Sequence, residues 1–183
     1  MNAAGASPPG AATTAPVARS VEAALLVGEI ERLGITHVLT VPDTHQKTLL
    51  ALLAAREQPR LLTVCTEDEA IAINAGLYIG GQRPMLLIQN NGLLASLNAL
   101  KAIALDARVP TLLLVGQFAR DVTRPSAESP VRAVRMVEPT LATWGVPCYP
   151  IEGPEDLPRF AEAYQCAQEE RGPAVVLLGA PTS

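Results

Sequence analysis

Short apolar runs alternate with longer segments of helical periodicity along most of this chain, and this alternation restricts its possible folds more than any other feature. The expected strands are residues 36–41, 61–65, 84–88, 111–115, 148–151 and 174–178. The expected helices are residues 17–33, 48–55, 67–79, 93–107, 131–143 and 155–170. Repeated strand–helix alternation requires right-handed crossovers between parallel strands. The sequence therefore predicts a single doubly wound α/β domain, with a central six-stranded parallel sheet flanked by helices.

The composition agrees with this class of fold. Of 183 residues, 49% are apolar, but the aromatics number only two Phe, three Tyr and one Trp, so the core is built from aliphatic side chains. Aliphatic strands are typical of a parallel sheet covered on both faces. Residues 1–17 are rich in Ala, Pro, Gly and Thr and have neither the basic start nor the apolar run of a signal peptide. We expect them to form a disordered tail, and residues 18–183 to form the domain.

Charge and cysteine usage exclude several functions. A net charge of −4 provides no basic footprint for nucleic acid. No run of eighteen apolar residues is present, so no membrane span is expected. The three cysteines are scattered, which argues against a disulfide framework or a zinc site and predicts a cytoplasmic protein with no metal ligands of its own. Neither G-x-G-x-x-G nor G-x-x-x-x-G-K-[ST] occurs, which disfavours a nucleotide-binding domain.

Glu67 is the first candidate for a functional residue, because it follows an apolar strand and opens an apolar helix. Its charge state would depend on whatever approaches the end of that strand. An ordinary helix start explains the same residues, since acids are favoured in the first turn and Thr66 with Glu69 has the form of a capping box.

Two further polar stretches follow expected strands. Asp43, Thr44 and His45 come after the first, and residues 89–92, Gln-Asn-Asn-Gly, come after the third. Ligands of open α/β sheets collect at the carboxyl ends of strands, which is where both stretches fall. Turn and capping chemistry accounts for the same residue types, so both explanations stay open.

Taken together, these stretches form an ordered set of motifs. In chain order they are Val41-Pro42-Asp43-Thr44, Glu67 nine residues before Gly76, Gln89-Asn90-Asn91-Gly92, and Asn98-Ala99-Leu100. This order resembles the pyrimidine-binding (PYR) domain of thiamine-diphosphate enzymes. Within that superfamily it is similar to the alpha subunits of sulfopyruvate decarboxylase and to the matching half of phosphonopyruvate decarboxylase.

The resemblance implies a role for each motif. Glu67 would be catalytic and would hydrogen-bond N1′ of the aminopyrimidine, which requires a poorly solvated carboxyl group. Gln89, Asn90 and Gly92 would join it in holding the pyrimidine half of thiamine diphosphate. The residues facing a small anionic 2-oxo acid, such as sulfopyruvate or phosphonopyruvate, would be Asp43, Thr44, His45 and Asn91. His45 would relay a proton or simply occupy the first turn of a helix.

The resemblance also implies a partner. In the family, the diphosphate and its Mg²⁺ are held by a separate PP domain with a G-D-G…N motif, and this chain contains no G-D-G. We therefore expect a PP-domain beta subunit without which the chain is inactive, and homodimerisation within an α2β2-type or larger assembly. A non-catalytic PYR-like scaffold and a carboligase subunit of the same superfamily are the alternatives.

The chain departs from the family pattern where substrate specificity is set. Asn91 stands where a small hydroxyl residue or alanine is usual, and residues 45–47 and 116–120 also differ from the common pattern. Lys47, Arg120 and Arg124 could bind an anionic substrate tail or could be solvated surface.

Overall fold

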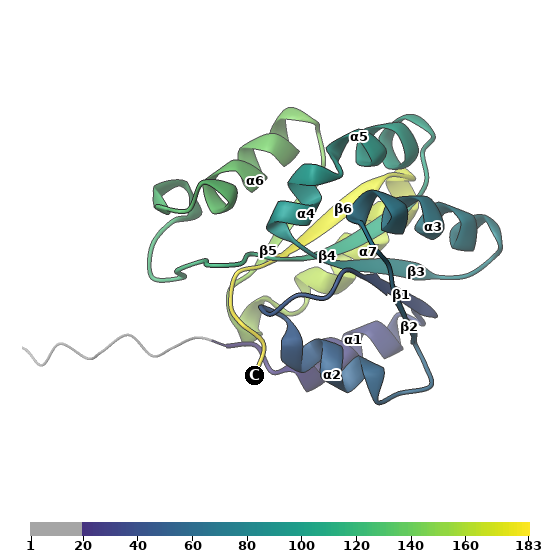
Figure 1. Cartoon of the computed structure of the whole chain (residues 1–183), viewed down its shortest axis with the longest axis horizontal. Coiled ribbons are helices and arrows are strands. Elements are labelled where there is room, and N and C mark those ends of the chain that lie inside the picture. The colour runs from purple at the N-terminus through teal and green to yellow at the C-terminus, as the bar shows by residue number, and fades with distance from the viewer. Residues whose placement is uncertain (1–19) are drawn as a thin grey trace, which may run out of the picture.

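Six parallel strands form one sheet in the computed structural model, which describes residues 20–183 (Figure 1). The strands are β1 (His37–Thr40), β2 (Arg60–Thr63), β3 (Pro84–Gln89), β4 (Thr111–Gly116), β5 (Cys148–Ile151) and β6 (Pro173–Leu178). Their order is β2-β1-β3-β4-β6-β5, and every neighbouring pair is parallel. The predicted six-stranded, doubly wound sheet is confirmed. The predicted tail, residues 1–17, lies outside the described residues.

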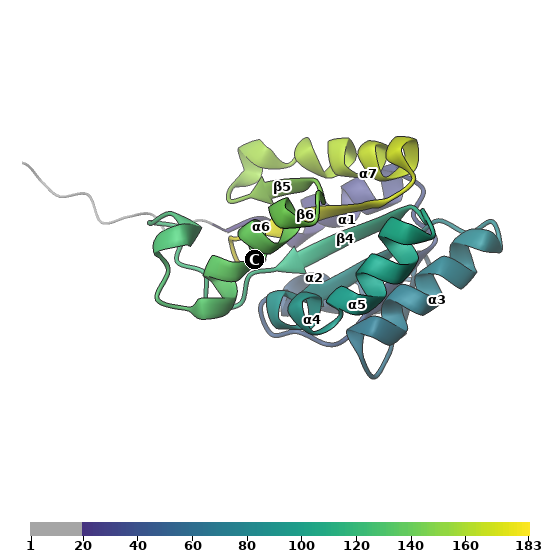
Figure 2. The same cartoon turned by 90° about the horizontal axis from the view of Figure 1, so that it is seen from above.

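Helices cover both faces of the sheet. They are α1 (Ala23–Arg32), α2 (Lys47–Ala54), α3 (Glu67–Ile79), α4 (Asn90–Ala95), α5 (Leu97–Ala99), the π-helix η1 (Leu100–Asp106), α6 (Arg132–Thr143) and α7 (Arg159–Glu170). Two 3-10 turns, η2 (Ser126–Glu128) and η3 (Pro154–Asp156), complete the elements. The buried residues of α1, α2 and α7 belong to one core, and those of α3, α4, η1 and α6 to the other. Figure 2 shows α3, α4 and α5 on the opposite side of the sheet from α7.

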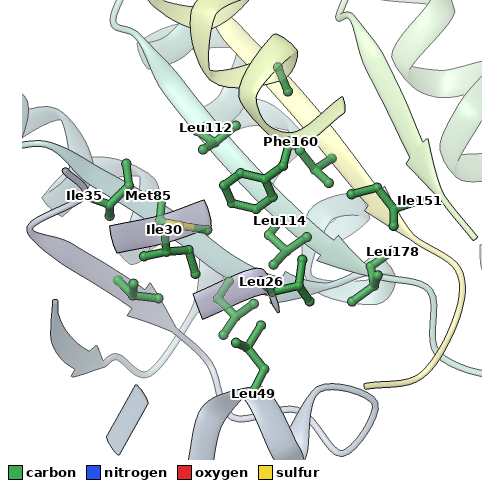
Figure 3. Close-up of a cluster of buried hydrophobic side chains, with 14 of the residues drawn as sticks. Leu26, Ile30, Ile35, Leu49, Met85, Leu112, Leu114, Ile151, Phe160 and Leu178 are labelled. Carbon is green, nitrogen blue, oxygen red and sulfur yellow. The ribbon is translucent and has the colours of Figure 1, made fainter. Parts of the chain in front are cut away.

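Alternation along the strands produces these two cores. Leu112 and Leu114 of β4 face the first core, whereas Leu113 and Val115 face the second, as period-2 geometry requires. Figure 3 shows the first core, in which the Phe160 ring of α7 lies beside the β4 leucines. Because both faces are buried, the strand reads as a continuous apolar run in the sequence.

The helix expected over residues 93–107 is where the structure differs most from the prediction. Helical structure begins at Asn90, is interrupted at Ser96 and continues as π-helix from Leu100. The buried Ser96 hydroxyl donates to the carbonyl of Leu93, 3.2 Å away, and such bonding to the preceding turn competes with regular helix geometry. The interruption therefore coincides with a buried polar side chain whose one hydrogen bond among the described residues is to the preceding turn.

Two other helices begin later than expected. The first described residues before α1 include Val21, which forms a parallel bridge with Thr182, so the helix starts only at Ala23. The last helix starts at Arg159 instead of 155, because Pro154 opens a separate 3-10 turn ahead of it.

The helices α1, α6 and α7 are each followed by a glycine in the sequence, and two of these glycines adopt the left-handed conformation. Gly34 and Gly145 adopt positive φ, +67° and +68°, directly after α1 and α6 have ended. After α7, however, the left-handed residue is Arg171, with φ 52°, and not the following Gly172. A side chain with a Cβ therefore occupies a conformation that favours glycine.

Arg171→Gly is expected to raise the free energy of unfolding by roughly 0.5–1 kcal/mol, because relief of left-handed strain exceeds the extra chain entropy of glycine. Chemical denaturation of the two proteins measures it. Gly145→Ala is the matched control, for which a decrease in the free energy of unfolding is expected. Nothing lies within 4 Å of a Cβ at this position, so the decrease would come from the positive φ alone. An Arg171→Gly variant less stable than the parent contradicts this account.

Within residues 20–183 the three cysteines are free thiols, and no group of three His, Cys, Asp or Glu side chains is placed to hold a metal ion. Burial, assisted by the charge of Glu138, raises the pKa of the Cys148 thiol to about 12. None of the helices in this part of the chain is both long and apolar enough to cross a bilayer.

Candidate active site

The carboxyl edge of the sheet brings the predicted site residues together. The chain leaves β1 toward β2 on one side, and β3 lies on the other side of β1, so the strand order reverses between β1 and β3. Such a switch point leaves a crevice in which open α/β sheets bind ligands. The segments after β1 and after β3, which carry seven of the predicted residues (Asp43, Thr44, His45, Gln89, Asn90, Asn91 and Gly92), meet at this point.

Asp43 links the two segments. It is buried, 7% exposed, and its Oδ1 accepts hydrogen bonds from the backbone N–H of His45 at 2.9 Å and from Nε2 of Gln89 at 2.8 Å. Gln89 Oε1 in turn accepts from Asn91 Nδ2 at 3.0 Å. A charged acceptor strengthens the first two bonds, so Asp43 fixes the orientation of the Gln89 amide, and Gln89 that of Asn91.

Asn90 fixes the turn from the other side. It is fully buried, its Oδ1 accepts from the N–H of Asn91 at 2.9 Å, and its Nδ2 donates to the carbonyl of Phe118 at 3.4 Å. The turn after β3 is thereby held to the loop after β4. Asn91 is left exposed on the surface of the edge.

Glu67 reaches the same turn from α3. Its half-buried side chain lies directly over Gly92 in the first turn of α4: a Cβ at Gly92 would lie 2.0 Å from Glu67 Oε1 and 2.5 Å from its Cγ. Any side chain at position 92 would displace the carboxyl group. Within the described part of the chain, Glu67 has no hydrogen-bond or ion-pair partner, so the carboxyl group is available to a ligand.

The start of α3 differs in detail from the expected capping box. Glu69 Oε2 accepts the N–H of Cys65 at 2.9 Å, one residue before the Thr66 N–H that a capping box uses, and Thr66 makes no side-chain cap. The Thr66 hydroxyl bonds instead to Asp68 and lowers the pKa of that carboxyl. Asp68 and Glu69 thus serve the helix start, and Glu67 is the acid that the helix start does not use.

The sequence did not indicate the roles of three further residues of this edge, which it placed only within the segments 45–47 and 116–120 that depart from the family pattern. The side chain of Gln46 is fully buried and donates to the carbonyl of Ile88 at 3.1 Å. This requires Gly116, since a Cβ there would lie 2.3 Å from Gln46 Nε2 and 3.0 Å from Asp43 Oδ2. Gln117, 2% exposed, has an amide nitrogen without a partner among the described residues. The one available signal was the glycine that ends an otherwise aliphatic strand.

Buried polar atoms without a partner concentrate at this edge. Among residues 20–183 they are Asp43 Oδ2, His45 Nε2, Gln46 Oε1, Gln117 Nε2, Arg120 Nε and Thr182 Oγ1, with Asn74 Oδ1 in α3 as the exception. Unsatisfied buried groups are costly and uncommon in folded proteins, and they mark places where a ligand or water completes the structure.

The two candidate arginines are largely engaged within the chain. Arg120 Nη1 donates to the carbonyls of Asp121 and Arg124, and Nη2 pairs with Glu152. Arg124 Nε pairs with Asp121 at 2.8 Å. Their guanidinium groups mainly hold the loop after β4, so the expectation that either is a free anion-binding cation is not supported by these contacts.

Comparison with known proteins gives three results. Residues 22–134 match the family model described as thiamine pyrophosphate enzyme, N-terminal TPP binding domain. "Sulfopyruvate decarboxylase subunit alpha" of Methanocaldococcus jannaschii is 28% identical over 134 residues, 72% of this chain and 78% of the relative. A "Phosphonopyruvate decarboxylase" of Streptomyces viridochromogenes is 34% identical over 94 residues, 51% of this chain and 24% of that protein.

The fold has a solved counterpart. The crystal structure of benzoylformate decarboxylase from Polynucleobacter necessarius superimposes with a TM-score of 0.64 at 24% identity, over 87% of this chain. The chain spans 30% of that protein's length. At this identity the likeness shows the fold alone.

Proposed function

This chain belongs to the thiamine pyrophosphate enzyme family through its N-terminal TPP-binding domain, and from this premise we propose that it is the alpha (PYR) subunit of a two-subunit thiamine-diphosphate-dependent 2-oxo acid decarboxylase. The observation that carries the proposal is the position of Glu67. Its carboxyl group lies over Gly92, in the first turn of α4 at the carboxyl edge of the sheet, and is unpaired among residues 20–183.

The residues present fit the pyrimidine half of the cofactor. Glu67 offers a carboxyl group for which the described part of the chain provides no competing partner, and the close approach of Gly92 restricts its position. Gln89 and Asn90 are held in place by Asp43 and by the carbonyl of Phe118, so their orientation does not depend on a ligand. Thiamine diphosphate, when bound, accepts the electron pair left as carbon dioxide departs from a 2-oxo acid. In this assignment Glu67 holds a proton at N1′ of the aminopyrimidine.

The residue environment explains how Glu67 would be set for this task. Ala70 and Ile71, three and four residues further along the same helix, lie on the same side of it as Glu67 and are fully buried. Glu67 as a whole residue is half-buried in the chain alone. Covering this edge with a second protein would remove the remaining water and favour a shared proton over one lost to solvent.

For the substrate, we propose a small anionic 2-oxo acid such as sulfopyruvate or phosphonopyruvate. The names of the relatives support this class. Thr44 and Asn91 are both exposed beside the hydrogen-bonded network around Asp43, so both can meet a substrate. The Asp43 carboxylate orients its neighbours, which makes it a positioning residue in this scheme.

We further propose a PP-domain beta subunit that carries the G-D-G…N motif and holds the diphosphate with Mg²⁺, in a cytoplasmic α2β2-type or larger assembly. The "subunit alpha" in the name of the relatives supports a partner. Phe118, 45% exposed beside the turn after β3, and Ile79, 79% exposed at the end of α3, offer apolar surface for protein contacts.

The test is a pull-down of the tagged full chain from its host in thiamine diphosphate and Mg²⁺, followed by assays of the recovered complex with a panel of 2-oxo acids. A partner of similar size with G-D-G…N, and release of carbon dioxide from an anionic 2-oxo acid, are the expected results. A complex without turnover contradicts the proposal and favours a scaffold, and a joined product in place of an aldehyde identifies a carboligase.

A further inference from the structure

A pocket of about 340 Å³ lies beside the candidate active site. Its walls come from the start of α2, the loop after β4 and the segment after β6, with Thr44, Lys47, Phe118, Arg120 and Thr182 among its residues. Figure 1 shows the end of the chain after β6 passing beside α2, and the Thr48 hydroxyl holds it there by donating to the carbonyl of Thr182 at 3.3 Å. The volume is at the lower end of the range for small-molecule sites.

The pocket is continuous with the site already described. Thr44 and His45 directly follow Asp43, which orients Gln89. Phe118 is one of the residues that line the pocket, and its backbone carbonyl accepts a hydrogen bond from Asn90 Nδ2. Two loops therefore border both the pocket and the turn after β3, so one small molecule can contact both.

Two deeply buried side chains of the pocket have donors without partners. Thr182 is 9% exposed and its Oγ1 is unsatisfied within residues 20–183. The Arg120 side chain is 3% exposed, and although its Nη atoms are engaged, its Nε has no acceptor. Leaving such groups desolvated is unfavourable, so an acceptor in the pocket would stabilise both.

The electrostatics of the pocket favour an anion. Lys47 is exposed and forms no ion pair with any described residue. It stands at the first position of α2, an eight-residue helix without a side-chain cap, so the N–H groups of the first turn and the helix dipole add positive potential. Burial lowers the pKa of His45 despite the opposing effect of Asp43, so this ring is neutral near pH 7. Of the nearby acids, Glu152 is paired with Arg120. Asp43 does not line the pocket, and it accepts from His45 and Gln89 through Oδ1 while its Oδ2 has no partner among the described residues.

We infer that this pocket binds the tetrahedral oxyanion at the far end of the substrate, with Lys47 supplying the charge and Thr182, Thr44 and Arg120 Nε supplying hydrogen bonds. The inference rests on the proposed function, to which it adds the place and the residues that hold the sulfonate or phosphonate tail. Lys47 and Thr182 are the specificity-determining residues in this assignment. Arg120 forms part of the pocket wall and supplies one hydrogen-bond donor, its Nε.

Binding of inorganic sulfate to the full chain tests the pocket without any catalysis. Calorimetric titration with sodium sulfate, against sodium chloride at equal ionic strength, is expected to show binding that Lys47→Met and Thr182→Val each weaken by about tenfold. Lys101→Met is the matched control, because the only other lysine is exposed and paired with Asp106. No binding, or an equal loss in the Lys101 variant, overturns the inference.

The reconstituted complex tests the link to the substrate. Lys47→Met is expected to raise KM for sulfopyruvate about tenfold with little change for pyruvate, and sulfate is expected to compete with sulfopyruvate. Non-competitive inhibition by sulfate would assign the pocket to a separate anion and overturn the tail assignment. An inactive parent complex whose alpha chain still binds sulfate through Lys47 would retain the oxyanion site and reject the proposed function, so the two failures are distinguishable.

Discussion

Glu67→Gln is expected to reduce turnover of the reconstituted complex by about 10²–10⁴-fold, the usual contribution of a positioned acid or base. Glutamine keeps the size of the side chain and its fit over Gly92 but cannot exchange a proton with the cofactor. Because Glu67 is half-exposed and has no partner among the described residues, the stability of the chain is expected to change by less than about 0.5 kcal/mol. Steady-state decarboxylation and thermal denaturation measure the two effects.

Glu69→Gln provides the control for Glu67→Gln. Glu69 lies two residues along the same helix turn and accepts the N–H of Cys65, so its replacement affects only a local hydrogen bond. We expect nearly full activity and a loss of stability of about 1 kcal/mol or less. Equal activity of the Glu67 variant and the parent would remove Glu67 from the mechanism, and equal losses in both variants would assign the effect to the helix start.

Gly92→Ala is expected to lower turnover about 10²-fold while leaving the fold intact. The new Cβ would overlap the Glu67 carboxyl group, which must rotate away, and displacement of a catalytic group by about 1 Å costs a factor of this size. The backbone at Gly92 is helical, so alanine is conformationally acceptable and would favour the helix by up to about 1 kcal/mol. Activity and unfolding free energy are therefore expected to move in opposite directions.

Two comparisons establish that Gly92 acts through Glu67. Gly28→Ala, in α1 with no atom within 4 Å of a Cβ, is expected to be as stable as the parent or more so and fully active. In the double variant, Gly92→Ala is expected to add little to the loss caused by Glu67→Gln, because the displaced group is already ineffective. Additive losses would show that Gly92 has a separate role, and full activity of Gly92→Ala would contradict the contact itself.

Local patterns predicted most elements correctly. Some misses had a local cause, at Ser96 and Pro154, and others were caused by a tertiary contact. The aliphatic runs of β3, β4 and β6 identified strands because both faces of the sheet are covered. The helix after β3 begins at Asn90 and not at residue 93, because the side chains of Gln89 and Asn90 are held by Asp43 and the Phe118 carbonyl. A polar turn in the sequence thus became the first turn of a helix.

The candidate site divides in the same way. The order of the motifs placed Asp43, Glu67 and residues 89–92 at strand ends, and the parallel sheet brought these ends to one edge. The order of the motifs did not indicate that Gln46 fills the space left by Gly116. Nor did it indicate that the Arg120 guanidinium group pairs with Glu152 and donates to two backbone carbonyls. These contacts join segments that lie far apart in the chain, so no local spacing reveals them.

The sequence by itself determined the alternation of strands and helices, because periodicities of 2 and 3.6 depend on near neighbours, and it determined which polar residues follow a strand. Only the tertiary structure decided what those residues face. The strand order sets Gln89 on Asp43, the packing of α3 on α4 sets Glu67 over Gly92, and the segment after β6 closes a pocket at the start of α2. Each of these contacts joins segments that are distant in the chain. Their arrangement depends on the crossovers and on burial in the whole fold, and no short stretch of sequence determines it.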